Sequence, residues 1–298
     1  MPEIDKVKSA KLHPDITPNA DWKKELAKLR RQIIPKIGQV TNVRIEIQRI
    51  TAQLHGLLSP TPGHPEPLYI ALLYVLSKAF LKQAEEEVTA KPDTAFPLAH
   101  VFVGLLEKGH FQLGNVFMAK LVQMSSHWVV GAVITRESGQ SDEDYRIALG
   151  RRPESSGETT VQYIERLGGL VTLYAAILQT PYQSNLPAEQ LHQIPTYVRL
   201  PRLWTWIIRL VNHPGLMADR AAPVILSCIL EATGEVASAM WPRQMAKLRS
   251  VLLQKASEPE QPGSSLIGGP EGKAGRVRLK LLMEKWEKDG LRRWEPMR

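Results

Sequence analysis

Cysteine is nearly absent from this sequence of 298 residues, in which Cys228 is the only one. A single thiol excludes a disulfide framework and a cysteine-based zinc site, and it fits a reducing compartment. Long apolar runs are also missing, because the longest, residues 168–178, is far shorter than the ~20 residues that span a bilayer. The first fifteen residues contain no apolar segment of a signal peptide. We therefore expect a soluble, intracellular protein without membrane insertion.

Aromatic residues are scarce at 6%, while Leu, Ile, Val and Ala are plentiful within a hydrophobic content of 43%. This mixture is enough for a sizeable core and favours helix-on-helix packing over a β-sandwich. What the sequence has in excess is positive charge, with a formal net charge of +8. Such a balance favours an acidic partner, such as nucleic acid, anionic lipid, a polyphosphate or an acidic protein surface, without choosing among them.

Apolar residues recur at helical spacing along most of the chain, and no stretch shows sustained strand alternation. The expected helices cover residues 19–35, 41–58, 67–88, 96–107, 112–124, 159–180, 195–212, 216–231, 235–255 and 271–290. Pro35 is expected to end the first of them. Successive helices with short turns predict an all-α, HEAT-like stack of helical hairpins. We expect residues 1–20 to form an irregular leader and residues 21–298 a single domain, with exposed loops near 135–158 and 255–272.

Motifs of catalysis and metal binding are missing. The stretch "GGPEGKAG" (268–275) is one residue short of a phosphate-binding loop, and Ala274 stands where Ser or Thr would meet magnesium. The eight histidines are scattered, with none at the spacing of a zinc site. No nucleophile elbow is present, and Cys228 lies among apolar residues, where a buried structural thiol is expected. The sequence therefore predicts no catalytic residues, no metal site and no enzyme.

Two lysines, Lys78 and Lys82, lie four residues apart and so share one face of the 67–88 helix. Glu85 and Glu86 follow on the same side, which leaves two interpretations open. The residues form a solvated stripe of mutually paired charges, or the lysines are half of an anion site. Pattern alone favours the solvated stripe, since charge runs on helices usually face water. Other basic positions are Arg30, Arg31, Lys36 and Lys120, and sequence does not show that they converge.

Five segments, in order, resemble one family. They are "IIPKIGQVTN" (33–42), "KQAEEEVTAKPDTAFPLAHV" (82–101), "DYRIALGRRP" (144–153), "YIERLGGLVTLYAAILQT" (163–180) and "GRVRLKLLMEKW" (275–286). Together they look like the carboxy-terminal domain of the Gle-type mRNA export mediators of the nuclear pore, from about residue 22 to the end of the chain. The long coiled coil that precedes this domain in the family is absent, so the chain is expected to be an excised domain.

This resemblance implies an all-α, HEAT-like fold related to the middle domain of translation-initiation scaffolds. It also implies a non-enzymatic activator of a DEAD-box RNA-dependent ATPase at the cytoplasmic face of the nuclear pore. In fungal relatives inositol hexakisphosphate tethers activator and ATPase, and the activator promotes RNA release. An FG-type nucleoporin is a further implied partner, and direct nucleic-acid contact is not expected.

The resemblance also implies the ligand residues. Carried over position by position, the inositol hexakisphosphate site would use Arg30, Lys78, Lys82, Lys120 and Lys247. The chain departs from the family at Gln123 and Met124, where a twin lysine stands in a fungal pattern, which puts the affinity of the site in doubt.

The last expected helix carries Ala274, Val277 and Leu281 at helical spacing. Core packing is the simple interpretation of such a stripe, and the resemblance makes it a candidate partner surface for the ATPase or the nucleoporin. The alternative function is a basic helical module that binds RNA directly, which the pI near 9.5 favours weakly and the absence of an RNA-recognition motif disfavours.

Overall fold

The computed structural model describes residues 19–133, 135–183, 186–257, 266–290, 294, 295 and 297. Within these ranges the chain is helical, and its only extended pairing is an isolated bridge between Val43 and Met297. Most of the expected leader, residues 1–18, lies outside the described residues. The predicted all-α fold is confirmed.

The first half of the chain contributes α2 (Ala20–Gly38), α3 (Arg44–Leu58), α4 (Glu66–Gln83), the π-helical turn η1 (Ala84–Val88), α5 (Ala95–Glu107), α6 (Gln112–Ser125), α7 (His127–Val130) and α8 (Asp142–Ala148). The second half contributes α9 (Thr160–Gln179), α10 (Ala188–Gln193), α11 (Pro201–Asn212), α12 (Pro214–Met217), α13 (Ala222–Met240), α14 (Pro242–Ser257) and α15 (Lys273–Asp289). Short 3-10 turns, among them η2 (Pro92–Thr94) and η5 (Pro270–Gly272), connect them.

Local signals explain where several helices begin. Asn19 caps α2, because its side-chain oxygen accepts hydrogen bonds from the backbone N–H groups of Asp21 and Trp22, both at 3.0 Å. Thr159 and Gln162 form a reciprocal capping box at the start of α9. These caps satisfy backbone donors that the helices themselves leave free.

Two boundaries differ from the sequence expectation. Pro35 does not end α2, which continues to Gly38. Ile33 and Ile37, one turn apart around Pro35, are both fully buried, and their burial offsets the roughly 3 kcal/mol that an internal proline costs. The predicted break near residues 231–235 is also wrong, since α13 runs through Gly234 and ends at Met240. Gly234 is buried inside the helix, where packing outweighs its weak helix propensity.

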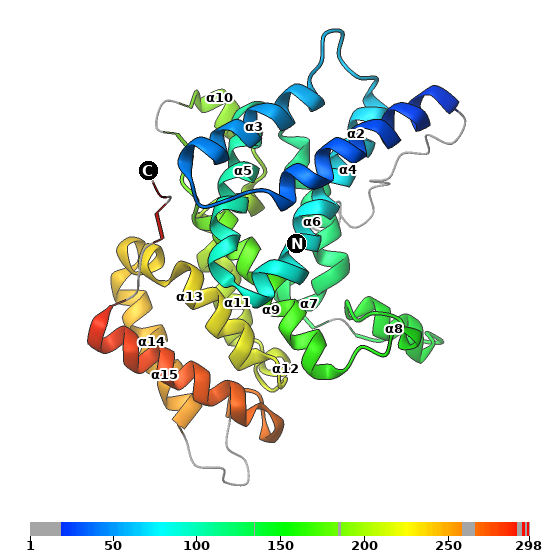
Figure 1. The fold of residues 1–298 in the computed structure, drawn as a ribbon. Coiled ribbons are helices and arrows are strands. Elements are labelled where there is room, and N and C mark those ends of the chain that lie inside the picture. The colour runs from blue at the N-terminus through cyan, green and yellow to red at the C-terminus, as the bar shows by residue number, and fades with distance from the viewer. Residues whose placement is uncertain are drawn as a thin grey trace.

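The helices stack from α2 and α3 at one end of the molecule to α14 and α15 at the other (Figure 1). Helix α9 lies in the middle and packs against α5, η1 and α13. Fourteen of its residues are buried. Helix α13 is long and apolar enough to cross a membrane, but 61% of its 18-residue apolar stretch is buried inside the protein. It packs on α9, α14 and α15, as a core helix does, so its length and apolar composition are weak evidence for membrane insertion.

Both expected exposed loops contain more structure than the sequence indicates. Residues 135–158 include α8, which Ser141 caps. In the second segment, residues 258–265 lie outside the described residues, but Leu266 and Ile267 are buried. The backbone N–H of Gly268 donates to Met217 at 2.7 Å, so the end of this segment is docked on the domain rather than exposed. The mostly polar composition of residues 255–272 led to the prediction of an exposed loop, although Leu266 and Ile267 anchor its end in the core.

Candidate functional site: a basic surface and an apolar groove

Helices α2, α4 and α6 pack side by side, with α4 in contact with both of the others (Figure 1). The ends of α2 and α4 meet closely, because a Cβ on Gly38 would lie 3.4 Å from the Gln83 amide nitrogen. Arg30 lies on α2, Lys78 and Lys82 on α4, and Lys120 on α6. Four of the five predicted ligand residues therefore belong to three neighbouring helices. We call these four residues the basic surface.

Lys78 and Lys120 approach one aromatic ring. The Lys78 Nζ lies 5.7 Å from the centroid of the Tyr74 ring, and the Lys120 Nζ lies 5.2 Å from the same centroid. Both distances are within the range of a cation–π contact. Two helices thus place two ammonium groups around one side chain, which is direct geometric evidence that these lysines converge.

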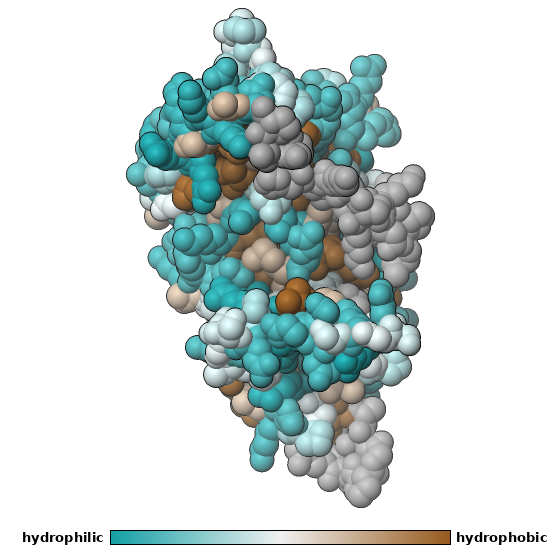
Figure 2. All heavy atoms as spheres, turned by 90° about the vertical axis from the view of Figure 1, so that its right-hand side faces the viewer, coloured by the Kyte–Doolittle hydropathy of each residue, from teal (hydrophilic) through white to brown (hydrophobic). Residues whose placement is uncertain are grey.

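Lys82 and Arg30 are the other two members of the basic surface. Lys82 is exposed and lies 3.7 Å from Glu86, one turn further along the helix. Such a surface pair contributes about 0–1 kcal/mol and leaves the ammonium accessible. Arg30 is exposed beside a shallow hollow on α2 that it lines together with Lys23, Arg31 and Ile34. The side of the molecule that carries α2 and α8 is largely hydrophilic, with hydrophobic patches between the polar groups (Figure 2).

Gln123, at a position where the fungal pattern predicts a lysine, contributes to the site in a different way. Its Oε1 accepts a hydrogen bond from the Lys120 Nζ at 2.7 Å. The amide therefore orients an existing ammonium group instead of adding a second one. Met124 is half-buried and packs against the core, so it offers no polar group to a ligand.

Glu85 does not pair with the lysines, which corrects half of the solvated-stripe interpretation. Its carboxylate turns to α9, where Oε1 lies 3.1 Å from Nη1 of Arg166, and its Oε2 lies 3.3 Å from Nη2 of Arg152. The π-helical turn η1 carries Glu85 to this position, directly over Gly169 of α9. A Cβ on Gly169 would lie only 2.1 Å from the Ala84 carbonyl oxygen.

Arg166 is the centre of a buried charge network that we call the arginine hub, formed by Glu85, Arg152, Glu158 and Arg166. Arg166 Nε donates to Glu158 at 2.7 Å, and its Nη2 donates to the Gly150 carbonyl at 2.9 Å. Burial acts to raise the pKa of Glu158, but hydrogen bonds from Arg166 lower it overall. Through Glu85, Arg152 and Arg166 the hub joins three of the segments that carry the family resemblance, 82–101, 144–153 and 163–180. These contacts hold the segments against one another.

Lys247, the fifth predicted ligand residue, is not brought to the basic surface. It is exposed on α14, and α14 packs on α13 and α15 at the opposite end of the stack from α2 and α4 (Figure 1). Helical spacing could not show this separation, because it fixes the face of a helix and not the helix's neighbours. Lys247 is therefore outside a single site built on Arg30, Lys78, Lys82 and Lys120.

The three residues of the predicted partner surface line a second feature, a groove of about 980 Å³ between α15, α13 and the turn before α5. Ala274 is exposed, and the exposed fractions of Val277 and Leu281 are 55% and 60%. Core packing is thus excluded for this stripe, because the buried face of α15 is the one that carries Leu279 and Met283.

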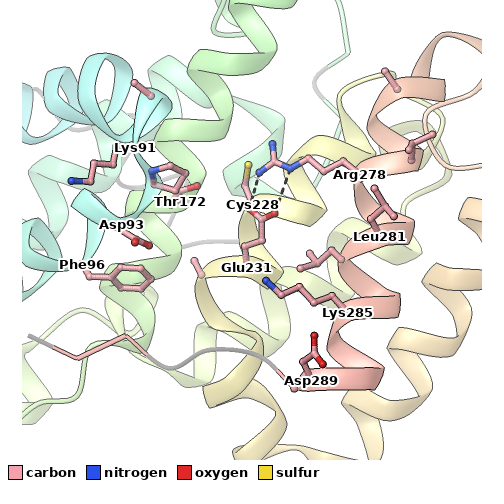
Figure 3. A pocket seen from close by; sticks show the side chains of 17 residues that line it. Lys91, Asp93, Phe96, Thr172, Cys228, Glu231, Arg278, Leu281, Lys285 and Asp289 are labelled. Atoms are coloured by element: carbon pink, nitrogen blue, oxygen red, sulfur yellow. Dashed lines mark hydrogen bonds and ion pairs between the residues drawn. The ribbon is translucent and has the colours of Figure 1, made fainter.

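Charged side chains surround this apolar groove (Figure 3). Arg278 donates to Glu231 at 2.6 Å across the groove floor, and Lys285 and Asp289 extend from the same helix. Lys91 and Asp93 lie on the facing wall beside Phe96. Cys228 also lines the groove but is buried, and burial raises the pKa of its thiol, so it is a structural residue here.

Sequence reasoning missed Tyr74, the contact of Gln123 with Lys120, and the arginine hub. The spacing of Tyr74 and Lys78, one turn apart on a single helix, was a usable signal for the first. Nothing in the sequence placed Lys120 over the same ring, or Arg166 against Glu85. Within the described ranges no three His, Cys, Asp or Glu side chains are close enough together to hold a metal ion.

Fold and site together define a helical scaffold protein with a basic surface on α2, α4 and α6 and an apolar groove beside α15. A family profile described as GLE1-like protein matches residues 3–253. The chain belongs to the GLE1-like protein family.

Two curated relatives illustrate the likeness. The chain is 27% identical to the mRNA export factor GLE1 of Saccharomyces cerevisiae over 276 residues, which is 91% of this chain and 47% of the relative. It is 33% identical to the mRNA export factor GLE1 of Danio rerio over 196 residues, which is 65% of this chain and 26% of the relative. The chain thus spans about half, or less, of the length of these relatives.

The fold also matches a solved structure with a TM-score of 0.79 and 26% identity, covering 99% of this chain and 96% of the other. That structure is described as the C-terminal domain of S. cerevisiae Dbp5 bound to Gle1 and IP6, with one substitution in each protein. A related complex without the Gle1 substitution matches with a TM-score of 0.75 and 25% identity.

Proposed function

We propose that this chain is a non-enzymatic activator of a DEAD-box RNA-dependent ATPase in mRNA export. It binds inositol hexakisphosphate (IP6) on the basic surface, and the ligand tethers the chain to the ATPase and promotes RNA release. The chain activates the ATPase at the cytoplasmic face of the nuclear pore. Family membership and the Gle1 complex with Dbp5 and IP6 support this assignment.

The convergence of Lys78 and Lys120 on Tyr74 is the observation that carries the proposal. A small, densely anionic ligand needs several cations held at fixed separations on rigid elements. Helices α2, α4 and α6 supply such elements. Like-charge repulsion among the lysines disfavours the free surface, and a polyphosphate relieves it. A ligand that contacts both proteins then strengthens their association, because the two binding free energies are coupled.

An ATPase assay tests this function. The purified chain alone is expected to hydrolyse no ATP, and to raise the RNA-stimulated turnover of its cognate DEAD-box protein, more strongly with IP6. Charge reversal of Lys78 and Lys82 together should remove the IP6-dependent part of the increase and leave the rest. An unchanged IP6 effect in that double variant would refute the site, and ATP hydrolysis by the chain alone would refute the non-enzymatic role.

We propose that the groove beside α15 binds an FG-type nucleoporin and not the ATPase. The groove is bordered by α13 and α15, which lie toward the end of the stack away from α2 and α3, and it presents Val277 and Leu281 to solvent. Leu281→Asp should weaken nucleoporin binding at least tenfold and leave ATPase stimulation intact. Ile45→Asp is the matched control, since Ile45 is 68% exposed on α3 outside the groove. Loss of ATPase stimulation with retained nucleoporin binding would assign the groove to the other partner.

Direct RNA binding is the competing function for the basic surface. A filter-binding titration across salt concentrations separates the two, because direct RNA binding falls steeply with salt. We expect no measurable RNA binding by the chain alone at physiological salt. Tight, salt-dependent binding that Lys78→Glu abolishes would favour the RNA-binding function.

A further inference from the structure

Tyr74 lies between two lysines of the basic surface, Lys78 and Lys120, although it carries no charge. It lies half-buried on α4, one turn before Lys78, and its ring is approached by Lys78 from its own helix and by Lys120 from α6. The face of an aromatic ring is electronegative and attracts an ammonium group at these distances. One ring therefore attracts two cations that repel each other.

The two lysines keep hydrogen-bonding capacity while they contact the ring. An ammonium group carries three N–H donors. The Lys120 Nζ gives one of them to the Gln123 amide oxygen at 2.7 Å. For Lys78 neither an ion pair nor a hydrogen bond to another described residue is found, and its side chain is exposed. Both ammonium groups can therefore donate to phosphate oxygens without leaving the ring.

We propose that Tyr74 is a positioning residue of the anion site, which holds Lys78 and Lys120 in place before the ligand arrives. A lysine side chain otherwise loses much of its rotamer freedom when it binds a phosphate. Restricting that freedom in advance, and lowering the repulsion between the two cations, both increase affinity. This inference rests on the proposed function, because it concerns the same IP6 site.

Substitution of the ring tests the inference by calorimetric titration of IP6 into the full chain with its ATPase. Tyr74→Leu removes the aromatic face and should weaken IP6 binding about fivefold, the effect of two exposed cation–π contacts of modest strength. Tyr74→Phe keeps the face and should bind within twofold of the parent. Tyr145→Leu is the matched control, since the Tyr145 ring lies 6.0 Å from the Arg136 guanidinium on the α8 segment, and IP6 binding should be unchanged.

Salt dependence separates positioning from charge. Tyr74→Leu should leave the slope of affinity against salt unchanged, because no phosphate–ammonium contact is lost, whereas Lys78→Gln should reduce it. Equal IP6 affinity of Tyr74→Leu and the parent would overturn the inference, as would an equal loss in Tyr74→Phe.

A measurement on the unsubstituted chain covers the case in which Tyr74→Leu fails to fold. The ring should shift the NMR signals of the ε-methylene protons of Lys78 and Lys120 upfield, and should not shift those of Lys82. Unshifted signals for both lysines would overturn the inference. If charge reversal of Lys78 and Lys82 leaves IP6 binding intact, the proposed function fails. If that reversal abolishes binding while Tyr74→Leu has no effect, only the positioning role of Tyr74 fails.

Discussion

The basic surface and the arginine hub share one short stretch of chain, residues 78–85, and they use charge in opposite ways. Lys78 and Lys82 point to solvent from α4, while Glu85, in the next turn, points inward to Arg166. In the hub the charges are paired, and its centre is buried, with side-chain exposed fractions of 7% for Arg166 and 5% for Glu158, while Arg152 at the edge is 53% exposed. On the surface the cations outnumber the anions. Buried pairing thus holds the helices of the scaffold together, whereas exposed and weakly paired charge on the surface is available to a ligand.

The largest expected effect comes from opening the hub. Arg166→Met leaves the carboxylates of Glu85 and Glu158 with only the exposed Arg152 as an ionic partner, and breaking a buried pair in this way costs about 3–5 kcal/mol of unfolding free energy. Urea unfolding measures it. The matched control is Arg49→Met, which breaks the exposed Arg49–Glu46 pair and should cost under about 1 kcal/mol. Equal losses in the two variants would mean that the hub does not hold the fold together.

The buried His110, with its partners His55 and Tyr69, makes the stability of the fold depend on pH. His110 lies 2.9 Å from His55 and 2.8 Å from the Tyr69 hydroxyl. Burial, with His55 and Lys108 adding to it, lowers the pKa of His110 from 6.5 to about 4. The unfolded chain therefore takes up the proton first as pH falls, and the folded state loses stability between about pH 6.5 and pH 4.

For His110 alone this loss reaches at most about 3 kcal/mol. Unfolding free energies measured across that pH range should decrease as the pH falls, and His110→Gln should flatten the decrease. His192→Gln is the control, because His192 is exposed. A profile that is the same in His110→Gln and in the parent would exclude His110 as its source.

Close helix packing beneath η1 gives the next effect. Gly169→Ala adds a methyl group 2.1 Å from a backbone oxygen, which cannot move aside like a side chain, so about 1–3 kcal/mol of stability should be lost. Gly56→Ala tests the opposite situation within α3, where nothing lies within 4 Å of the added group. That variant should be stabilised by roughly 0.4–1 kcal/mol. Thermal unfolding of both proteins checks the pair.

Restoring one charge to the surface should have the smallest effect. Gln123→Lys adds a cation beside Lys120 and should raise IP6 affinity about three- to tenfold, the value of roughly one ionic contact near a protein surface. Gln112→Lys makes the same change at the other end of α6 and should leave the affinity unchanged. An unchanged or weaker affinity in Gln123→Lys would show that the amide's contact with Lys120 matters more than the added charge.

The sequence predicted local features better than their convergence. Apolar periodicity identified α9 and the long α4 helix, and Asn19 and Thr159 marked helix starts, because these signals lie within one turn. Pro35 and Gly234 misled the boundaries, since burial of their neighbours outweighs local propensity. Lys78 and Lys82 could be assigned to one face, but Lys120 over Tyr74 and Lys247 at the far end of the stack depend on tertiary packing. The exposure of Val277 and Leu281 could not be predicted, because an apolar stripe on a helix has the same sequence pattern whether it packs in a core or lines a groove.

The most direct test of the account is the dissociation constant of the chain–ATPase complex, measured with and without IP6. We expect IP6 to tighten the complex at least tenfold, and charge reversal of Lys78 and Lys82 to remove the tightening. Charge reversal of Lys247 should leave it unchanged. Full IP6 tightening in the Lys78 and Lys82 double variant, or its loss on reversal of Lys247 alone, would contradict the account.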